Sequence, residues 1–210
     1  MLSILAGLSI LMIGDSHLSK PDYLIGPLHD NLLMQGAQVH SVGVCGSIPG
    51  NWLAVTAGAC GSAERVGKSP AVLQTTNAAT KSISSLIAAE KPALVVIVMG
   101  DTIAAYDKPD FPKTWAWQQT TALVKAISAT GTACAWVGPS WGTEGGRYGR
   151  TYARVELMSK FLAANVAPCR YIDSLSMSKR GQWPTADGQH LSPGGYKQWA
   201  DAIAQSLKQR

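Results

Sequence analysis

Apolar residues along the chain gather in two kinds of segment, which alternate. Short continuous apolar runs are typical of strands buried on both faces of a sheet, and longer segments with apolar residues three and four positions apart are typical of helices. The runs predict strands at 8–13, 38–44, 93–99, 133–137 and 170–172, and the longer segments predict helices at 27–35, 75–90, 114–129, 151–165 and 193–207. This alternation predicts an α/β fold: a three-layer α/β/α sandwich with a five-stranded parallel sheet, formed by one domain over residues 1–210.

The segment from 45 to 70 interrupts this alternation. It is rich in glycine and serine, and it is longer than most connections between a strand and a helix. Connections of this length often carry function. We therefore expect part of the functional site to come from this segment.

The charge of the chain is positive but dispersed. The 210 residues carry a formal net charge of +5, and the sequence pI is about 9.1. The basic residues form no stripe interleaved with aromatic residues, so we expect no nucleic-acid partner. The apolar stretch at residues 1–17 is too short to cross a bilayer and lacks a charged start. We therefore expect no stable membrane insertion, and no signal peptide is visible.

The four cysteines suggest an oxidising compartment. They form no C-x-x-C pair, which argues against structural zinc, and we expect neither a metal nor a cofactor. Cys45 and Cys60 flank one loop, whereas Cys134 and Cys169 each open an apolar run of neighbouring expected strands. The hypothesis is therefore two disulfides, Cys45–Cys60 and Cys134–Cys169, and a periplasmic or secreted location. Four reduced, buried thiols are the alternative.

Residues able to carry catalysis follow the expected strands. In parallel sheets, sites gather beyond the carboxyl ends of the strands. Ser16 comes after the first strand and a glycine, and Asp187 and His190 lie in a polar loop after the last strand. A serine hydroxyl needs an imidazole to take its proton, and that imidazole needs an acid to fix its tautomer. We therefore expect Ser16 to be the nucleophile, His190 the base and Asp187 its acidic partner.

The chain resembles the SGNH, or GDSL-type, hydrolase family over nearly its whole length. Gly14-Asp15-Ser16 matches the first motif of that family, and Asp187-Gly188-Gln189-His190 matches the last. Neither motif is specific alone, but their order and spacing make the combination strong. The resemblance implies a flavodoxin-like SGNH hydrolase fold. It also implies an oxyanion hole formed by the backbone N–H groups of Ser16 and Gly46.

One position departs from the pattern of this family. After the third strand the family has an asparagine that completes the oxyanion hole, whereas this chain has Asp101. An ionised carboxylate would repel an oxyanion, and a missing donor typically costs about 10²–10³ in rate. Asp101 is either protonated, or turned away while Thr102 or a backbone N–H donates, which is the alternative we favour. Otherwise the enzyme is slow, or a partner or the substrate completes its site.

Three further residues are candidates for substrate binding. His17 adjoins the nucleophile, and Trp52 and Trp141 fall in expected loops near the site, where flat aromatic faces would suit stacking on sugar rings. Packing in the core is the alternative for both tryptophans. Glu144, Arg147 and Arg150 follow the fourth strand, but no motif supports contact with a substrate.

These observations favour hydrolysis of a carboxylic ester. The resemblance implies a serine esterase for small acyl groups, and an extracytoplasmic location suggests acetyl esters on a carbohydrate. An O-acetyltransferase of cell-envelope or secreted polysaccharide would use the same triad with a sugar hydroxyl as acceptor. A glycan-binding module without catalysis is a further alternative, supported by Asp101. The expected partners are an acylated carbohydrate or a small ester, with an envelope protein as a possible additional partner.

Overall fold

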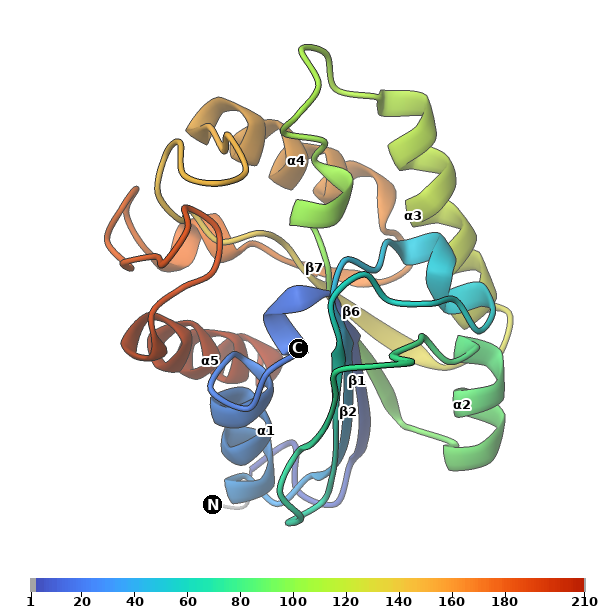
Figure 1. Cartoon of the computed structure of the whole chain (residues 1–210). Helices are drawn as coiled ribbons and strands as arrows, with labels where there is room; N and C mark the ends of the chain where they lie inside the picture. Colours follow the sequence, from blue (N-terminus) through green and yellow to red (C-terminus); the bar gives the residue numbers. More distant parts are fainter. Residues whose placement is uncertain (1–2, 210) are drawn as a thin grey trace.

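The computed structural model describes residues 3–209, and a single twisted sheet forms the middle of these residues (Figure 1). The sheet has seven strands in the order β4-β3-β2-β1-β5-β6-β7 within the described residues. The strands are β1 (Ser9–Gly14), β2 (Gln38–Val44), β3 (Ser62–Val66), β4 (Val72–Gln74), β5 (Leu94–Val98), β6 (Ala133–Val137) and β7 (Arg170–Ile172).

The expected number of five strands was wrong, although the five strands expected from the sequence are present and parallel. The two additional strands, β3 and β4, form an antiparallel hairpin beside β2. Their residues SAERV and VLQ form no continuous apolar run, because the hairpin lies at the edge of the sheet and β4 is exposed. Edge strands are not buried on both faces, so the pattern that reveals a central strand is missing from them.

Helices cover both faces of the sheet and complete three layers. In Figure 1, α1 and α5 lie side by side against one face, and α2 and α3 lie on the other side of the sheet together with α4. The helices are α1 (Ile25–Met34), α2 (Ile83–Glu90), α3 (Lys113–Ser128), α4 (Tyr152–Asn165) and α5 (Pro193–Leu207), with short 3-10 turns η1 (Ser16–Leu18), η2 (Pro49–Leu53), η3 (Asp101–Ile103) and η4 (Ser174–Met177).

Helix α2 begins later than the sequence predicts. The expected helix at 75–90 is helical only from Ile83, and Asn77 has a positive φ of 56°. The residues before Ile83 are mostly threonine, asparagine and serine, whose side chains compete with helical hydrogen bonds. Thr80 shows this competition, because its hydroxyl donates to backbone carbonyls of the preceding loop, including that of Asn51 (2.7 Å).

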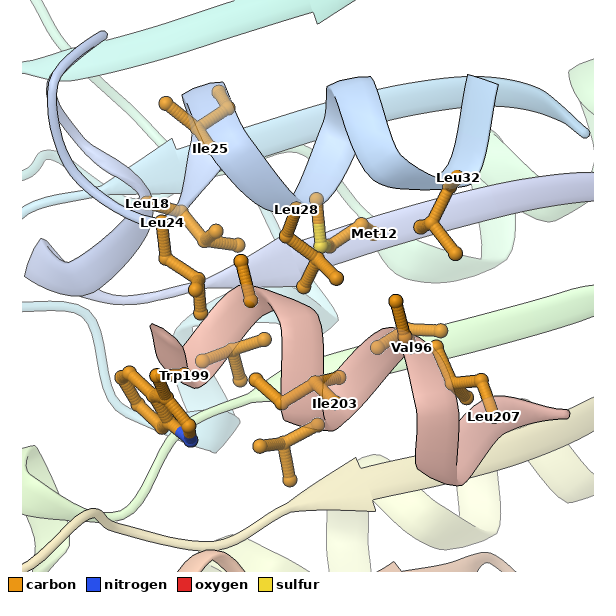
Figure 2. Packing of buried hydrophobic residues seen from close by; sticks show 14 of the residues in the cluster. Met12, Leu18, Leu24, Ile25, Leu28, Leu32, Val96, Trp199, Ile203 and Leu207 are labelled. Carbon is orange, nitrogen blue, oxygen red and sulfur yellow. The ribbon is translucent and has the colours of Figure 1, made fainter. Parts of the chain in front are cut away.

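The core holds the carboxyl ends of the parallel strands at fixed positions. Met12 of β1 and Val96 of β5 are fully buried beneath α1 and α5, where they meet Leu28 and Ile203 (Figure 2). Each fully buried aliphatic side chain of this kind contributes roughly 1.5–3 kcal/mol. The loops that follow β1 and β5 therefore start from a rigid base.

Both expected disulfides are present. Cys45–Cys60 closes the loop between β2 and β3, and Cys134–Cys169 joins the start of β6 to the residue before β7. No free cysteine remains in the described residues, which excludes the alternative of four reduced thiols for this structure. Among residues 3–209, no helix has the length and apolar character needed to span a membrane.

Candidate active site

Ser16 lies at the sharp turn that follows β1. Gly14 makes this turn possible, because a Cβ at that position would lie 2.5 Å from the carbonyl oxygen of Val98. The carboxylate of Asp15 accepts a hydrogen bond from the N–H of His17 (3.1 Å) and so caps the short turn η1. Burial raises the pKa of Asp15 to about 6. Asp15 therefore stabilises the turn that contains Ser16, and its role there is structural.

The structure brings the three expected triad residues into one chain of hydrogen bonds. His190 Nε2 lies 2.7 Å from Ser16 Oγ, although the two residues are 174 positions apart. His190 Nδ1 lies 2.7 Å from Asp187 Oδ2. The other carboxylate oxygen of Asp187 accepts the N–H of His190 (2.8 Å) and that of Gln189 (3.0 Å). This geometry allows a proton to pass from the hydroxyl to the imidazole while the carboxylate orients the ring.

Burial and a neighbouring charge lower the pKa of His190, which favours its neutral form. Burial lowers the pKa of His190, and the nearby His17 lowers it further, which outweighs the opposite effect of Asp187. Burial would raise the pKa of Asp187, but the hydrogen bonds from His190 and Gln189 outweigh burial and hold this pKa below its ordinary value. A neutral imidazole beside an ionised carboxylate is the protonation state that a general base requires.

A glycine-rich loop supports Asp187. The N–H of Arg147 donates to the carbonyl of Asp187 (3.0 Å), and the N–H of Thr143 donates to that of Gly188 (2.9 Å). Gly146 has a φ of 66°, and a Cβ on it would lie 2.2 Å from the Asp187 carbonyl oxygen, so only glycine permits this contact. Sequence reasoning missed this role, although the four glycines between 142 and 149 were a signal of close backbone packing.

Two tyrosines enclose the imidazole. The ring of Tyr23 stacks on His190 with ring centroids 5.4 Å apart, and the ring of Tyr148 meets His190 edge-on at 5.9 Å. Tyr23 also stacks on Tyr196 of α5, at 4.8 Å. These contacts restrict the ring of His190 to the orientation that faces Ser16. The sequence offered no signal for either tyrosine, since each is a single aromatic residue in a loop.

Gly46 lines the same cavity as Ser16 and His190. Its φ of 77° favours glycine, and a Cβ there would lie 2.9 Å from the Cβ of Ala59. The disulfide Cys45–Cys60 and the bond from the N–H of Ala59 to the carbonyl of Cys45 (3.0 Å) hold this segment. In the described part of the chain, the N–H groups of Ser16 and Gly46 have no hydrogen-bond partner, and both residues line the same cavity. Both donors are therefore free to bind an oxyanion.

Asp101 is the centre of a buried polar cluster. Its Oδ2 lies 2.8 Å from Nε2 of His17, and its Oδ1 accepts hydrogen bonds from Nη1 of Arg150 (2.6 Å) and the hydroxyl of Tyr106 (2.5 Å). The side chains of Asp101 and Arg150 are fully buried. Burial would raise the pKa of Asp101, but the charge of Arg150 and the hydrogen bond to His17 outweigh burial and hold this pKa far below its ordinary value.

This cluster bears on two of the alternatives for Asp101. A protonated Asp101 does not fit, because Arg150 and the other two partners stabilise the carboxylate. Both carboxylate oxygens are engaged by His17, Arg150 and Tyr106, which agrees with the alternative in which Asp101 turns away from the oxyanion. Sequence reasoning named Arg150 only as a residue that follows the fourth strand, because nothing local to it indicates a partner 49 positions away.

The three candidates for substrate binding do not line the cavity beside Ser16. His17 is buried, with Nδ1 2.9 Å from the Tyr196 hydroxyl and Nε2 on Asp101. Trp52 is fully buried, and its Nε1–H donates to the hydroxyl of Ser47 (3.2 Å).

Trp141 also makes contacts with other residues of the protein, both through its indole N–H and through its ring. Its Nε1–H donates to the carbonyls of Leu175 (2.9 Å) and Ser178 (3.0 Å), and its ring contacts Tyr152 and the guanidinium of Arg180. The expectation that Trp52 stacks on sugar was therefore wrong, because Trp52 packs in the core, which was the stated alternative. Trp141 is half-buried and does not line the cavity beside Ser16, and its stacking on sugar stays a prediction.

The cavity beside Ser16 has a volume of about 830 Å³ and a mixed polar lining. Cys45, Gly46 and Ala59 form one wall, whereas Tyr106, Asp107, Arg147, Tyr148 and Gln189 contribute polar groups to the others. Within residues 3–209, no three His, Cys, Asp or Glu side chains are arranged to hold a metal ion. The absence of a metal or cofactor in the reaction stays a prediction.

Comparison with known proteins concerns the family and the fold of the chain. No family model matches the chain. The chain is 42% identical to protein BcsX of Komagataeibacter xylinus over 206 residues, which cover 97% of this chain and 78% of that protein.

Two solved structures resemble the fold. One is a protein of Slackia heliotrinireducens described as an SGNH hydrolase, with a TM-score of 0.64 and 20% identity over 96% of this chain and 99% of that one. The other is a peptidoglycan O-acetylesterase, with a TM-score of 0.57 and 14% identity over 98% of this chain and 91% of that one. At these identities the likeness concerns the fold alone.

Proposed function

The chain belongs to the SGNH hydrolase family, and on this premise we propose that it is a serine esterase that cleaves small acyl esters of carbohydrates. The observation that carries the proposal is the continuous chain of hydrogen bonds from Ser16 through His190 to Asp187. The neutral state favoured for His190 supports its role as the base.

The proposed reaction has two steps. In the first, Ser16 Oγ attacks the ester carbonyl while His190 Nε2 takes the hydroxyl proton, and the N–H groups of Ser16 and Gly46 stabilise the oxyanion. The carbon–oxygen bond to the alcohol then breaks, and His190 returns the proton to the departing alkoxide. In the second step water attacks the acyl carbonyl while His190 Nε2 takes a proton from it. The bond between the acyl carbon and Ser16 Oγ then breaks, His190 returns the proton to Oγ, and the carboxylic acid leaves. Asp187 stabilises the imidazolium in both steps.

Several observations support a small acyl group on a sugar. The cavity beside Ser16 presents Asp107, Arg147 and Gln189, which can hydrogen-bond to hydroxyl groups. A protein of the same fold is named a peptidoglycan O-acetylesterase. The two disulfides support a periplasmic or secreted location, where such polymers are found.

Hydrolysis of p-nitrophenyl acetate and p-nitrophenyl butyrate tests the proposal. We expect the acetate to be the better substrate and Ser16→Ala to lower kcat at least about 10⁴-fold, because the nucleophile is lost. Circular dichroism of Ser16→Ala controls for folding. Full activity of the folded Ser16→Ala protein would show that another residue is the nucleophile.

A serine-directed phosphonate separates catalysis from simple glycan binding. We expect a covalent adduct on Ser16, located by mass spectrometry of peptides, and no adduct in His190→Ala. An unlabelled Ser16 would favour the alternative of a glycan-binding module. Labelling together with acetyl transfer to an added oligosaccharide in place of hydrolysis would favour the O-acetyltransferase, because both enzymes share the acyl-enzyme step.

A further inference from the structure

A second hollow lies next to the cavity beside Ser16. Its volume is about 610 Å³, within the range of ordinary small-molecule sites. Thr102, Ala105 and Asp107 line both the cavity and this hollow, so the two adjoin each other. Beyond these shared residues, Phe111 and Trp115 contribute the aromatic surface. We call the second hollow the Trp115 groove.

The loop between η3 and α3 contributes residues to the walls of both the cavity and the groove, and α4 holds this loop in place. One guanidinium, that of Arg154 in α4, donates to four carbonyls of this loop. They belong to Ala104 (2.9 Å), Ala105 (2.8 Å), Lys108 (3.0 Å) and Pro109 (2.9 Å). Ala105 has a φ of 50°, a left-handed conformation that is costly for alanine and persists only where the surroundings impose it. The shape of the groove therefore exists before any ligand binds.

The aromatic residues of the groove are also fixed. Phe111 meets Phe161 of α4 edge-on with ring centroids 5.2 Å apart, and Phe111 and Trp115 are half-buried against the core. A preformed aromatic surface loses little conformational entropy on binding. Both residues keep part of their surface exposed on the groove side, since they line it.

The groove combines aromatic faces with charged neighbours. Asp107, Lys108 and Asp110 are exposed and line it together with Phe111 and Trp115. A sugar ring matches this combination, because its C–H faces pack on aromatic rings while its hydroxyl groups bond to charged side chains. A long acyl chain would use only the aromatic faces and would leave the hydrogen-bonding groups of Asp107, Lys108 and Asp110 without a partner from the ligand.

We propose that the Trp115 groove binds a sugar unit next to the acylated one, so that the substrate is an O-acylated oligosaccharide or polysaccharide. This inference rests on the proposed function, because a sugar in the groove would be next to the acylated sugar only if the ester is cleaved in the adjoining cavity of Ser16. Trp115 is then a specificity-determining residue that touches the alcohol part of the substrate and not the reacting carbonyl.

Two tryptophans of α3 provide a matched pair for the test. Trp115 lines the groove, whereas Trp117 is 50% exposed on the same helix and does not line it. The substrates are acetylated xylotetraose, acetylated xylose and p-nitrophenyl acetate. We expect wild-type kcat/KM to be at least tenfold higher for the tetraose than for the acetylated xylose. Trp115→Ala lowers kcat/KM for the tetraose at least tenfold more than for p-nitrophenyl acetate, whereas Trp117→Ala leaves this ratio unchanged.

Other kinetic outcomes overturn the inference. Equal loss on all three substrates would mean that Trp115 only supports the fold, which thermal unfolding of the variant would confirm. An unchanged ratio in Trp115→Ala would show that the groove does not bind substrate. A selective loss on p-nitrophenyl octanoate would assign the groove to the acyl chain.

A binding experiment separates this inference from the proposed function. In Ser16→Ala labelled with ¹⁵N, the indole N–H signal of Trp115, assigned with Trp115→Phe, should shift on addition of the acetylated tetraose. The signal of Trp117 should not shift. A shift without any wild-type hydrolysis would refute the esterase and retain the groove as a sugar site. Hydrolysis of the acetate without a shift would retain the esterase and refute the sugar site.

Discussion

Replacement of Asp101 by asparagine should destabilise the protein strongly. The carboxylate is the only anion that contacts the guanidinium of Arg150 in the described residues, and both side chains are fully buried. Within the described residues, the other hydrogen bonds of Arg150 go to the neutral carbonyls of Ser140 and Trp141. The variant Asp101→Asn therefore leaves a buried cation without a counter-charge.

The size of the loss follows from this burial. Removal of one partner of a buried ion pair typically costs about 3–5 kcal/mol, because the remaining charge stays desolvated. In a domain of this size, 1 kcal/mol shifts Tm by about 2–4 °C, so Asp101→Asn should lower Tm by roughly 6–20 °C. Asp201 is the matched control. Its ion pair with Lys197 (2.9 Å) lies on the exposed surface of α5, where Asp201→Asn should cost less than about 1 kcal/mol.

Urea unfolding at several pH values is the appropriate assay. The pKa of Asp101 is lowered on folding, so its contribution is fully present above the ordinary value of 3.8 and is lost as pH falls toward the folded value. Burial would lower the pKa of His17, but its hydrogen bond to Asp101 outweighs burial and holds this pKa above 6.5, and Asp101→Asn removes that bond. We therefore expect the difference between wild type and Asp101→Asn to grow as pH falls toward 6.5 and to shrink only below about pH 4. The double variant Asp101→Asn/Arg150→Met should recover at least half of the loss, because no buried charge remains unpaired.

The same variant tests the role of Asp101 in activity. The family's asparagine would be restored, but the new amide would meet the guanidinium of Arg150 and the ring of His17 in place of an oxyanion. We therefore expect hydrolysis of p-nitrophenyl acetate to fall. A loss of stability below about 1 kcal/mol, or a rise in activity, would refute the reasoning that Asp101 serves as the anion of this cluster.

Three further predictions concern His190, Gly46 and the disulfide Cys45–Cys60. The kcat/KM for p-nitrophenyl acetate should fall with decreasing pH through a value below 6.5, because His190 must be neutral to act as base; a midpoint above pH 7 would contradict this assignment. Gly46→Ala should lower kcat about a hundredfold with little change in KM, because the methyl group meets Ala59 and displaces a donor N–H; unchanged kcat would exclude Gly46 from the oxyanion hole. Cys45→Ser/Cys60→Ser should lower the free energy of unfolding in urea by about 3 kcal/mol, as expected for a closed loop of this length, and an unchanged midpoint would show that the disulfide does not constrain the unfolded chain.

Local patterns predicted the central part of the fold well. The strand from Leu94 to Val98 reads as a strand in the sequence because every residue in it is apolar. The edge hairpin and the true start of α2 could not be predicted in the same way. One lies at the exposed edge of the sheet, and the other depends on the hydroxyl of Thr80 bonding to a distant loop.

The candidate site shows the same division. The motifs around Ser16 and His190 are local, and the order of strands already implied that they meet at one edge of the sheet. The partners of Asp101 were not predictable, because ion pairing with Arg150 depends on two loops that follow different strands. The tryptophans were also ambiguous, since sequence alone does not reveal which indole faces are covered. Trp52 is buried, whereas Trp115 lines a groove.

The sequence by itself therefore determined the alternation of strands and helices, the pairing of the cysteines and which three residues the structure joins in one chain of hydrogen bonds. These features follow from apolar periodicity and short motifs, which depend only on near neighbours in the chain. Only the tertiary structure decided that Arg150 is buried beside Asp101, that the glycine-rich loop supports Asp187, and that Trp52 lies in the core whereas Trp115 lines a groove. Burial and charge pairing are properties of residues that meet in space, and their energies arise only when the distant segments have packed together.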